Sequence, residues 1–231
     1  MSAIDRQREY YTRTAKDYDR IHFDETSPLG LAVLMASLEM LNAQSMLDIG
    51  SGTGRVLEHV RSRRPGQLSI GVEPVAALRE VGYERGIPRD SLVDGDATRL
   101  PYPDQAFDVV CAFAALHHIH APSLAVAEMI RVARKAIVIC DANNFAQGNA
   151  FARAVKRTFN SLGMWPLVDW IKTRGRGYSE SSGDGIAYSY SVFNDYRLIR
   201  ERCRNVHVLN LSGDGRHAYK GADSVVVLGL L

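Results

Sequence analysis

Short apolar runs alternate with amphipathic stretches along the middle of the chain. Strands are predicted where the run is short and mainly apolar, over residues 45–49, 68–73, 91–96, 107–113 and 135–142. Helices are predicted where apolar positions recur every three or four residues, over 55–63, 75–86 and 123–134. Apolar strands that alternate with helices are typical of a parallel sheet covered on both faces. Because crossover connections are right-handed, the pattern predicts an α/β fold with a doubly wound, mostly parallel sheet.

Different patterns occur on either side of this alternation. Helices are predicted over 5–19 and 28–41, and Pro28 suits the first turn of the second helix. Two apolar strands, 205–211 and 223–230, are separated by turn residues and are expected to form an antiparallel pair at one edge of the sheet.

Residues 143–200 interrupt the alternation and form a segment of their own. They contain ten of the nineteen aromatic residues of the chain. Within them, residues 172–185 are rich in glycine and serine and are expected to form a mobile loop. We expect this segment to be an insertion that lies over the main domain.

The composition narrows the class of protein. The chain has 231 residues, 46% of them hydrophobic, and a net charge of +2, which indicates a globular protein without a global attraction to nucleic acid or membranes. Its three cysteines lie far apart, which excludes zinc-ligand spacing and a disulfide framework, so no metal is expected. No secretory signal or membrane span is recognisable, and the expected location is the cytoplasm.

The stretch LDIGSGTGRVLEHV, residues 47–60, carries candidate chemistry. Gly50, Gly52 and Gly54 allow the backbone to turn sharply and approach a ligand, and a helix N-terminus with free N–H groups follows. An NAD-type pattern needs glycine at position 55, where the chain has Arg55, and Asp48 would repel a pyrophosphate. The turn therefore favours a neutral nucleoside with a cationic tail.

Two more acids follow at the ends of the next predicted strands. Glu73 lies nineteen residues after Gly54, where a carboxylate can accept hydrogen bonds from both hydroxyls of a ribose. Asp96 ends the third strand and can accept a hydrogen bond from an exocyclic amine such as that of adenine.

The motifs LDIGSGTG, GVEP, GDATRLPYPDQAFDVV and CAFAALHHI, in this order, resemble those of class I S-adenosylmethionine-dependent methyltransferases. The resemblance covers about residues 10–142 and is strongest to the small-molecule branch that includes ubiquinone and menaquinone methyltransferases. It implies a Rossmann-like sheet of seven strands whose last pair is reversed. It also implies S-adenosyl-L-methionine as cofactor and S-adenosyl-L-homocysteine as product.

The resemblance also implies roles for individual residues. The methionine part of the cofactor would contact the turn and the end of the fourth strand: Asp48, Gly50, Ser51, Gly52, Gly54, Phe113 and Ala114. The nucleoside would contact the ends of the second and third strands: Glu73, Pro74, Asp96 and Ala97. Tyr11 and Tyr18, in a segment that resembles the lid helix of the family, would close over the cofactor.

These assignments divide the chain into four parts. Residues 1–44 would be N-terminal lid helices, 45–142 the cofactor-binding core, 143–200 an inserted substrate lid, and 201–231 the strands that complete the sheet.

Methyl transfer from a sulfonium needs alignment of the reacting atoms and, for a hydroxyl acceptor, a general base. His117 and His118 follow the fourth strand and are the candidate catalytic residues, with His118 preferred; a structural role for both is the alternative. The expected acceptor is an oxygen or nitrogen atom of a small molecule.

The inserted segment is expected to determine which acceptor binds. Six of its aromatic residues are candidate walls of the acceptor site: Trp165, Trp170, Tyr178, Tyr188, Tyr190 and Phe193. Residues 151–177 also hold six Lys or Arg (Arg153, Lys156, Arg157, Lys172, Arg174, Arg176) against the single acid Asp169, which suits either an anionic acceptor or a solvated helix face.

Other functions remain as alternatives. They are an RNA methyltransferase, a non-catalytic S-adenosylmethionine-binding protein and a nicotinamide dehydrogenase. The Asp/Asn-Pro-Pro-aromatic turn of adenine-amino methyltransferases and the Gly-x-Arg-Asn-Val sequence of ubiquinone-type enzymes are both missing, so nucleic-acid and quinone acceptors are disfavoured.

Overall fold

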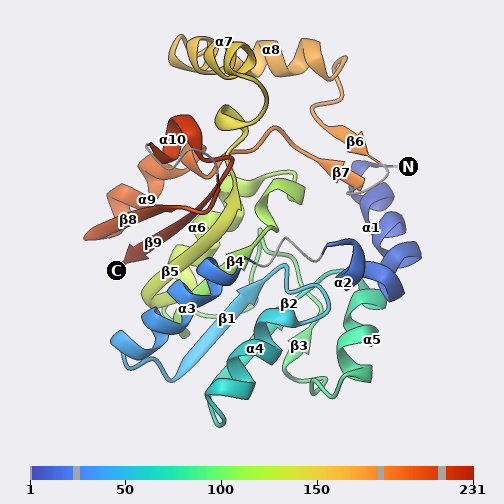
Figure 1. Ribbon diagram of the computed structural model, residues 1–231. Coiled ribbons are helices and arrows are strands. Elements are labelled where there is room, and N and C mark those ends of the chain that lie inside the picture. Colours follow the sequence, from blue (N-terminus) through green and yellow to red (C-terminus); the bar gives the residue numbers. More distant parts are fainter. Residues whose placement is uncertain (1, 23–26, 182–184, 213–216) are drawn as a thin grey trace.

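The computed structural model describes residues 2–22, 27–181, 185–212 and 217–231. One seven-stranded sheet in the order β3-β2-β1-β4-β5-β9-β8 runs through the centre (Figure 1). Its strands are β1 (Ser45–Ile49), β2 (Leu68–Val72), β3 (Leu92–Val93), β4 (Phe107–Phe113), β5 (Ala133–Ala142), β8 (Asn205–Asn210) and β9 (Ser224–Leu230). The first five are parallel, and β9 runs antiparallel between β5 and β8. The predicted doubly wound α/β sheet with a reversed strand pair is confirmed.

Helices cover both faces of the sheet, which explains why its central strands are apolar. All residues of β1 and β4 are buried. α3 (Pro28–Met40) and α4 (Arg55–Arg63) pack their apolar residues on one face. α6 (Pro122–Val132) and α9 (Tyr196–Arg202) pack on the other, while α5 (Ala76–Glu84) contacts β3.

The N-terminal segment is not the single helix predicted over 5–19. It forms α1 (Ala3–Thr14), a 3-10 turn (Ala15–Asp17) and α2 (Tyr18–Ile21). The hydroxyls of Thr12 and Thr14 donate to the carbonyls of the residues four positions earlier, a competition that weakens the end of a helix. The break lets the rings of Tyr11 and Tyr18 pack edge to face with their centroids 5.6 Å apart.

The predicted boundary between a helix that ends at residue 134 and a strand that begins at residue 135 is also wrong. α6 ends at Val132, and β5 already begins at Ala133, because Ala133 pairs with Phe107 of β4.

Residues 143–200 form short elements above the carboxyl edge of the sheet. They are the 3-10 turns Asn144–Ala146 and Val192–Asn194, the helices α7 (Ala150–Ser161) and α8 (Trp165–Lys172), and the strands β6 (Ser179–Ser181) and β7 (Gly185–Ala187). The loop predicted over 172–185 is wrong in part because β6 pairs with β7; residues 182–184 lie outside the described residues. β7 packs against α1, so chain segments from both sides of the core meet there (Figure 1).

A short helix, α10 (Ala218–Gly221), precedes β9. In the described part of the chain, no helix combines the length and the apolar character needed to cross a membrane.

Candidate functional site

A cavity of about 300 Å³ lies at the carboxyl edge of the sheet. The loops after β1, β2, β3 and β4 line its inner side, through residues that include Gly50, Glu73, Asp96 and Ala114. α1 and β7 line its outer side, through residues that include Tyr11 and Ile186. Parallel α/β sheets bind ligands at this edge, so the cavity is the candidate site.

The glycine turn after β1 brings bare backbone to this cavity. Gly50, Gly52 and Gly54 have φ angles of +66°, +56° and +80°, which residues with side chains rarely adopt. A Cβ on Gly50 would lie 2.5 Å from Cβ of Ala115, and a Cβ on Gly52 would lie 3.3 Å from the Tyr18 ring. The turn thus forms a cradle that a side chain would fill.

The side chain of Glu73 lies next to this turn. Its side chain is only 5% exposed and accepts hydrogen bonds from the backbone N–H groups of Gly52 (3.0 Å) and Val75 (2.8 Å). Burial raises the pKa of Glu73 to about 7, although both hydrogen bonds act in the opposite direction. A buried acceptor at the cavity wall can bind a ligand with neighbouring hydroxyl groups.

Asp48 lies beneath the turn, in a smaller cavity of about 20 Å³. Its carboxylate accepts a hydrogen bond from the Ser51 hydroxyl at 2.6 Å, and burial raises its pKa to about 6. Tyr18 and Gly50 line both cavities, so the smaller one adjoins the larger one at these two residues.

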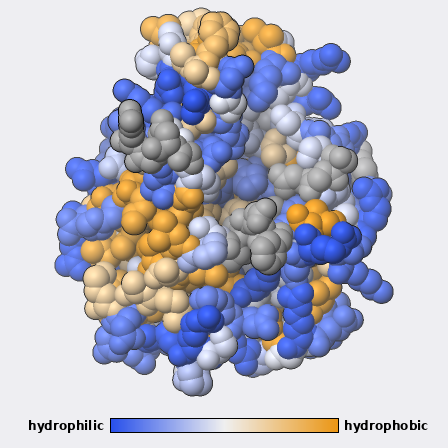
Figure 2. All heavy atoms as spheres, viewed as in Figure 1, coloured by the Kyte–Doolittle hydropathy of each residue, from blue (hydrophilic) through white to orange (hydrophobic). Residues whose placement is uncertain are grey.

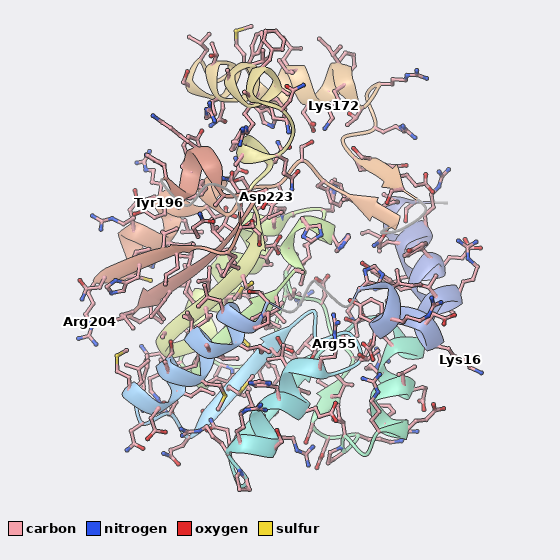
Figure 3. The ribbon with its side chains drawn as sticks, in the orientation of Figure 1. Lys16, Arg55, Lys172, Tyr196, Arg204 and Asp223 are labelled. Carbon is pink, nitrogen blue, oxygen red and sulfur yellow. The ribbon has the colours of Figure 1, made fainter. Side chains whose placement is uncertain are left out.

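Arg55 closes the smaller cavity from outside. Figure 3 labels Arg55, the first residue of α4. Its guanidinium carbon lies 5.5 Å from the centroid of the Tyr18 ring, and its Nε lies 3.4 Å from an oxygen of Asp19. Arg55 therefore holds the start of α2 against the glycine turn.

The predicted site residues separate into three groups. Nine line the larger cavity: Tyr11, Tyr18, Gly50, Glu73, Pro74, Asp96, Ala97, Ala114 and His118. Asp48, Ser51 and Phe113 line the smaller one. Gly52, Gly54 and His117 line neither, although Gly52 contributes the N–H group bound by Glu73.

His118 contacts both α1 and β7. Its Nδ1 lies 2.6 Å from the carbonyl oxygen of Ile186 in β7. Since a carbonyl only accepts, the proton of the neutral ring lies on Nδ1, and Nε2 carries the lone pair. The Gln7 side chain of α1 lies against the same ring. Its Nε2 is 3.3 Å from Nδ1, a contact without a hydrogen bond in this tautomer because both nitrogens are donors, and its Oε1 accepts from the backbone N–H of Ile186.

His117 has a different environment. Its Nδ1 lies 2.7 Å from Oδ1 of Asp141, which is buried at the end of β5. Burial raises the pKa of Asp141, but His117 and the N–H groups of Leu116 and Ala142 outweigh this and keep it below its ordinary value. The His117 ring lies 4.0 Å from the His118 ring, centroid to centroid, so His117 supports its neighbour.

Sequence reasoning missed Gln7, Asp141 and Ile186. A signal existed for two of them. Gln7 is four positions before Tyr11 and thus on the same helix face, and Asp141 is an acid at the end of an apolar strand, like Asp48. Nothing in the local sequence distinguishes Ile186.

The aromatic residues of the insert mostly pack elsewhere. Of the six candidate wall residues, all of which the structure describes, only Tyr188 lines the larger cavity. Trp165 packs on Phe145, and the buried Tyr190 donates its hydroxyl to Asp195 at 2.9 Å. The six basic residues of 151–177, also all described, do not line it either. The described residues contain no group of three His, Cys, Asp or Glu that could hold a metal ion.

Part of the chain is similar in sequence to known methyltransferases. Residues 47–140 match the family model described as a methyltransferase domain. A demethylmenaquinone methyltransferase from Roseiflexus is 32% identical over 140 residues, which is 56% of this chain and 58% of the relative. A phosphatidylethanolamine N-methyltransferase from Cereibacter sphaeroides is 34% identical over 125 residues, which is 51% of this chain and 61% of the relative. The chain thus spans less than two thirds of the length of these curated relatives.

Solved structures share the fold over nearly the whole chain. A possible histamine N-methyltransferase from Thermotoga maritima has a TM-score of 0.56 at 16% identity and covers 97% of this chain and 99% of its own. A methyltransferase from Aquifex aeolicus has a TM-score of 0.57 at 13% identity and covers 95% of this chain and 97% of its own. At such identities the likeness concerns the fold alone.

Proposed function

We propose that the protein is a class I methyltransferase that transfers a methyl group from S-adenosylmethionine to an oxygen or nitrogen atom of a small molecule. The match of residues 47–140 to the methyltransferase-domain model supports this proposal. The observation that carries this proposal is Glu73. Its buried carboxylate lies at the cavity wall and binds the backbone of the glycine cradle.

The residues present fit this cofactor. Glu73 would accept hydrogen bonds from the ribose hydroxyls, and Asp96 one from the adenine amine. Asp48 and the Tyr18 ring would attract the positively charged end, since carboxylates and aromatic faces both stabilise a cation. The cofactor supplies an electrophilic methyl group. By the same charges, the two buried acids disfavour the pyrophosphate of a nicotinamide dinucleotide.

The lid residues would align the acceptor and exclude water. Tyr11 from α1, and Ile186 and Tyr188 from or next to β7, cover the cavity from its outer side. These are apolar or aromatic side chains, which suits a flat or largely apolar acceptor. We assign residues 143–200 as the acceptor lid because β7 belongs to this segment. The six basic side chains lie outside the cavity, so they would not contact an acceptor bound inside it.

His118 is our candidate general base for a hydroxyl acceptor. Its Nε2 would take the proton, while the Ile186 carbonyl holds the proton on Nδ1 and fixes the ring. The His118→Gln substitution is expected to lower kcat about 100-fold with the cofactor Kd unchanged. The His59→Gln variant, on α4 and away from the cavity, serves as the control, and full turnover in His118→Gln would assign His118 a structural role.

Calorimetric titration tests the cofactor assignment. We expect micromolar binding of S-adenosylmethionine and S-adenosylhomocysteine and no heat with NADH. Glu73→Gln is expected to weaken binding about tenfold or more, since a buried acceptor for the ribose is impaired. Glu80→Gln, which alters an exposed carboxylate on the neighbouring helix, should bind normally. Absence of binding would refute the proposal.

A separate measurement tests the transfer itself. The protein is incubated with S-adenosylmethionine and a panel of small phenols, amines and polar lipids, and formation of S-adenosylhomocysteine is followed by mass spectrometry. Binding without product across the panel would favour a non-catalytic S-adenosylmethionine-binding protein.

A further inference from the structure

Large apolar side chains are exposed together on α7 and α8. Phe151 is 79% exposed, Leu162 64%, Leu167 54%, Trp170 60% and Ile171 62%. Every residue of α7, all of which the structure describes, is at least partly exposed. Figure 2 shows hydrophobic residues at the top of the molecule, where Figure 1 places α7 and α8, with hydrophilic residues below. We call these five side chains the helix-pair patch.

The patch is bordered by positive charge. Residues 151–177 hold six Lys or Arg and one acid, a net charge of 6 − 1 = +5, while the whole chain carries only +2. Lys172, labelled in Figure 3, ends α8, and the exposed Arg174 and Arg176 follow it. Asp169 is already engaged by the hydroxyl of Ser189 and lies 4.0 Å from Lys172. The border of the patch is therefore strongly cationic.

We propose that the helix-pair patch docks on the surface of an anionic lipid bilayer. An amphipathic helix with aromatic and aliphatic residues on one side and Lys and Arg beside them lies in the plane of a membrane interface. The apolar side chains would enter the boundary between headgroups and acyl chains. Lys172, Arg174 and Arg176 would contact the phosphates of anionic headgroups.

The charge distribution argues against other occupants. In a symmetric dimer through this patch, Lys172, Arg174 and Arg176 of one copy would lie near the same three residues of the other. A nucleic acid would bind the cations but leave five large apolar side chains in contact with water. A bilayer satisfies both features at once.

The location of the patch gives docking a consequence for the cavity. The segment after α8 leads directly into β6 and β7, and β7 lines the cavity and packs against α1 (Figure 1). A bilayer at the helix pair would thus lie on the lid side of the site. The docking does not depend on the proposed methyl transfer and is tested without turnover.

The experiment measures partition of the full chain onto vesicles by flotation. We expect binding to mixed vesicles of phosphatidylglycerol and phosphatidylcholine, and weaker binding to vesicles of phosphatidylcholine alone. At high salt, the protein should bind both kinds of vesicle equally. The Leu167→Glu/Ile171→Glu variant should lower the partition coefficient at least tenfold. The control Met40→Glu/Leu68→Glu alters side chains that are 63% and 54% exposed on other elements and should bind like the wild type.

A second pair of variants tests the charges. Lys172→Gln/Arg174→Gln/Arg176→Gln should lower partition about tenfold or more on anionic vesicles. Arg200→Gln/Arg202→Gln/Arg204→Gln removes the same charge from exposed residues elsewhere and should have little effect. No binding to any vesicle, or equal binding of patch and control variants, would overturn the proposal. A dimer that Leu167→Glu/Ile171→Glu dissociates would also overturn it, because the patch would then face a second copy.

Discussion

Two buried acids of the candidate site, Asp48 and Glu73, destabilise the folded protein when they are ionised. Asp48 and Glu73 are buried with pKa values raised to about 6 and about 7, because burial disfavours their charged forms. The sequence predicted both acids from their places at strand ends. It did not predict their burial, which depends on neighbours from several elements, among them Tyr18, whose ring lies against the glycine turn.

This cost gives stability a defined dependence on pH. The pKa of Glu73 in the folded protein is about 7, against an ordinary value of 4.5, so the folded state binds more protons than the unfolded state between these values. The stability that protonated Glu73 contributes is present at low pH and is lost as pH rises through about 7. Relative to the wild type, Glu73→Gln should therefore gain about 3 kcal/mol in free energy of unfolding between pH 4.5 and pH 8.

Urea denaturation at several pH values measures this gain. The comparison uses the change with pH, because the lost hydrogen bonds of the Glu73 side chain add a constant offset. Glu80→Gln, at an exposed position, should follow the wild type closely. Parallel curves for Glu73→Gln and wild type would show that Glu73 titrates normally.

At the scale of elements, apolar pattern and tertiary contact explain different parts of the fold. The strands and helices of residues 45–142 were predicted to within about three residues at their ends because each buries its own apolar face. The break after Thr14 and the pairing of β6 with β7 were not. Strand β6 is exposed over its whole length, so no apolar alternation marks it, and β7 is positioned by α1.

The contact between α1 and β7 is expected to stabilise α1 against local unfolding. Gln7→Ala removes the acceptor of the Ile186 N–H and the contact with His118. Since losing this hydrogen bond leaves the buried Ile186 N–H without its acceptor, at a cost of about 1.5 kcal/mol, amides of α1 should exchange hydrogen about tenfold faster. Hydrogen exchange measures this, with the exposed Glu9→Ala on the same helix as control. Unchanged exchange would mean that other contacts hold α1 closed.

At the scale of the whole molecule, the sequence predicted that 143–200 departs from the alternation but not how it is attached. Asn143 makes that attachment. It is fully buried, its Nδ2 donates to the carbonyls of Tyr219 (2.9 Å) and Ala222 (2.8 Å), and its Oδ1 accepts from the Ser191 hydroxyl (2.9 Å). Its backbone N–H donates to the carbonyl of Asp223, labelled in Figure 3. These partners are distant in sequence, so local pattern gives no sign of them.

Asn143→Ala is therefore expected to destabilise the whole protein. Several buried groups lose their partners, which should lower the free energy of unfolding by about 2–4 kcal/mol. Thermal and urea denaturation measure the loss. Asn149→Ala, which removes the exposed N-cap of α7, should cost only about 1 kcal/mol. Equal losses for the two variants would contradict the role of Asn143.

The lid contact also determines when the site is completed during synthesis. Gln7 and Ile186 are 179 residues apart in the chain. A growing polypeptide presents α1 first but gives it no β7 to pack against until most of the chain has left the ribosome. Contacts of such long range form late in folding, because a large loop must close before they form. Proteases should therefore cleave α1 in nascent or partly folded chains well before they reach the sheet.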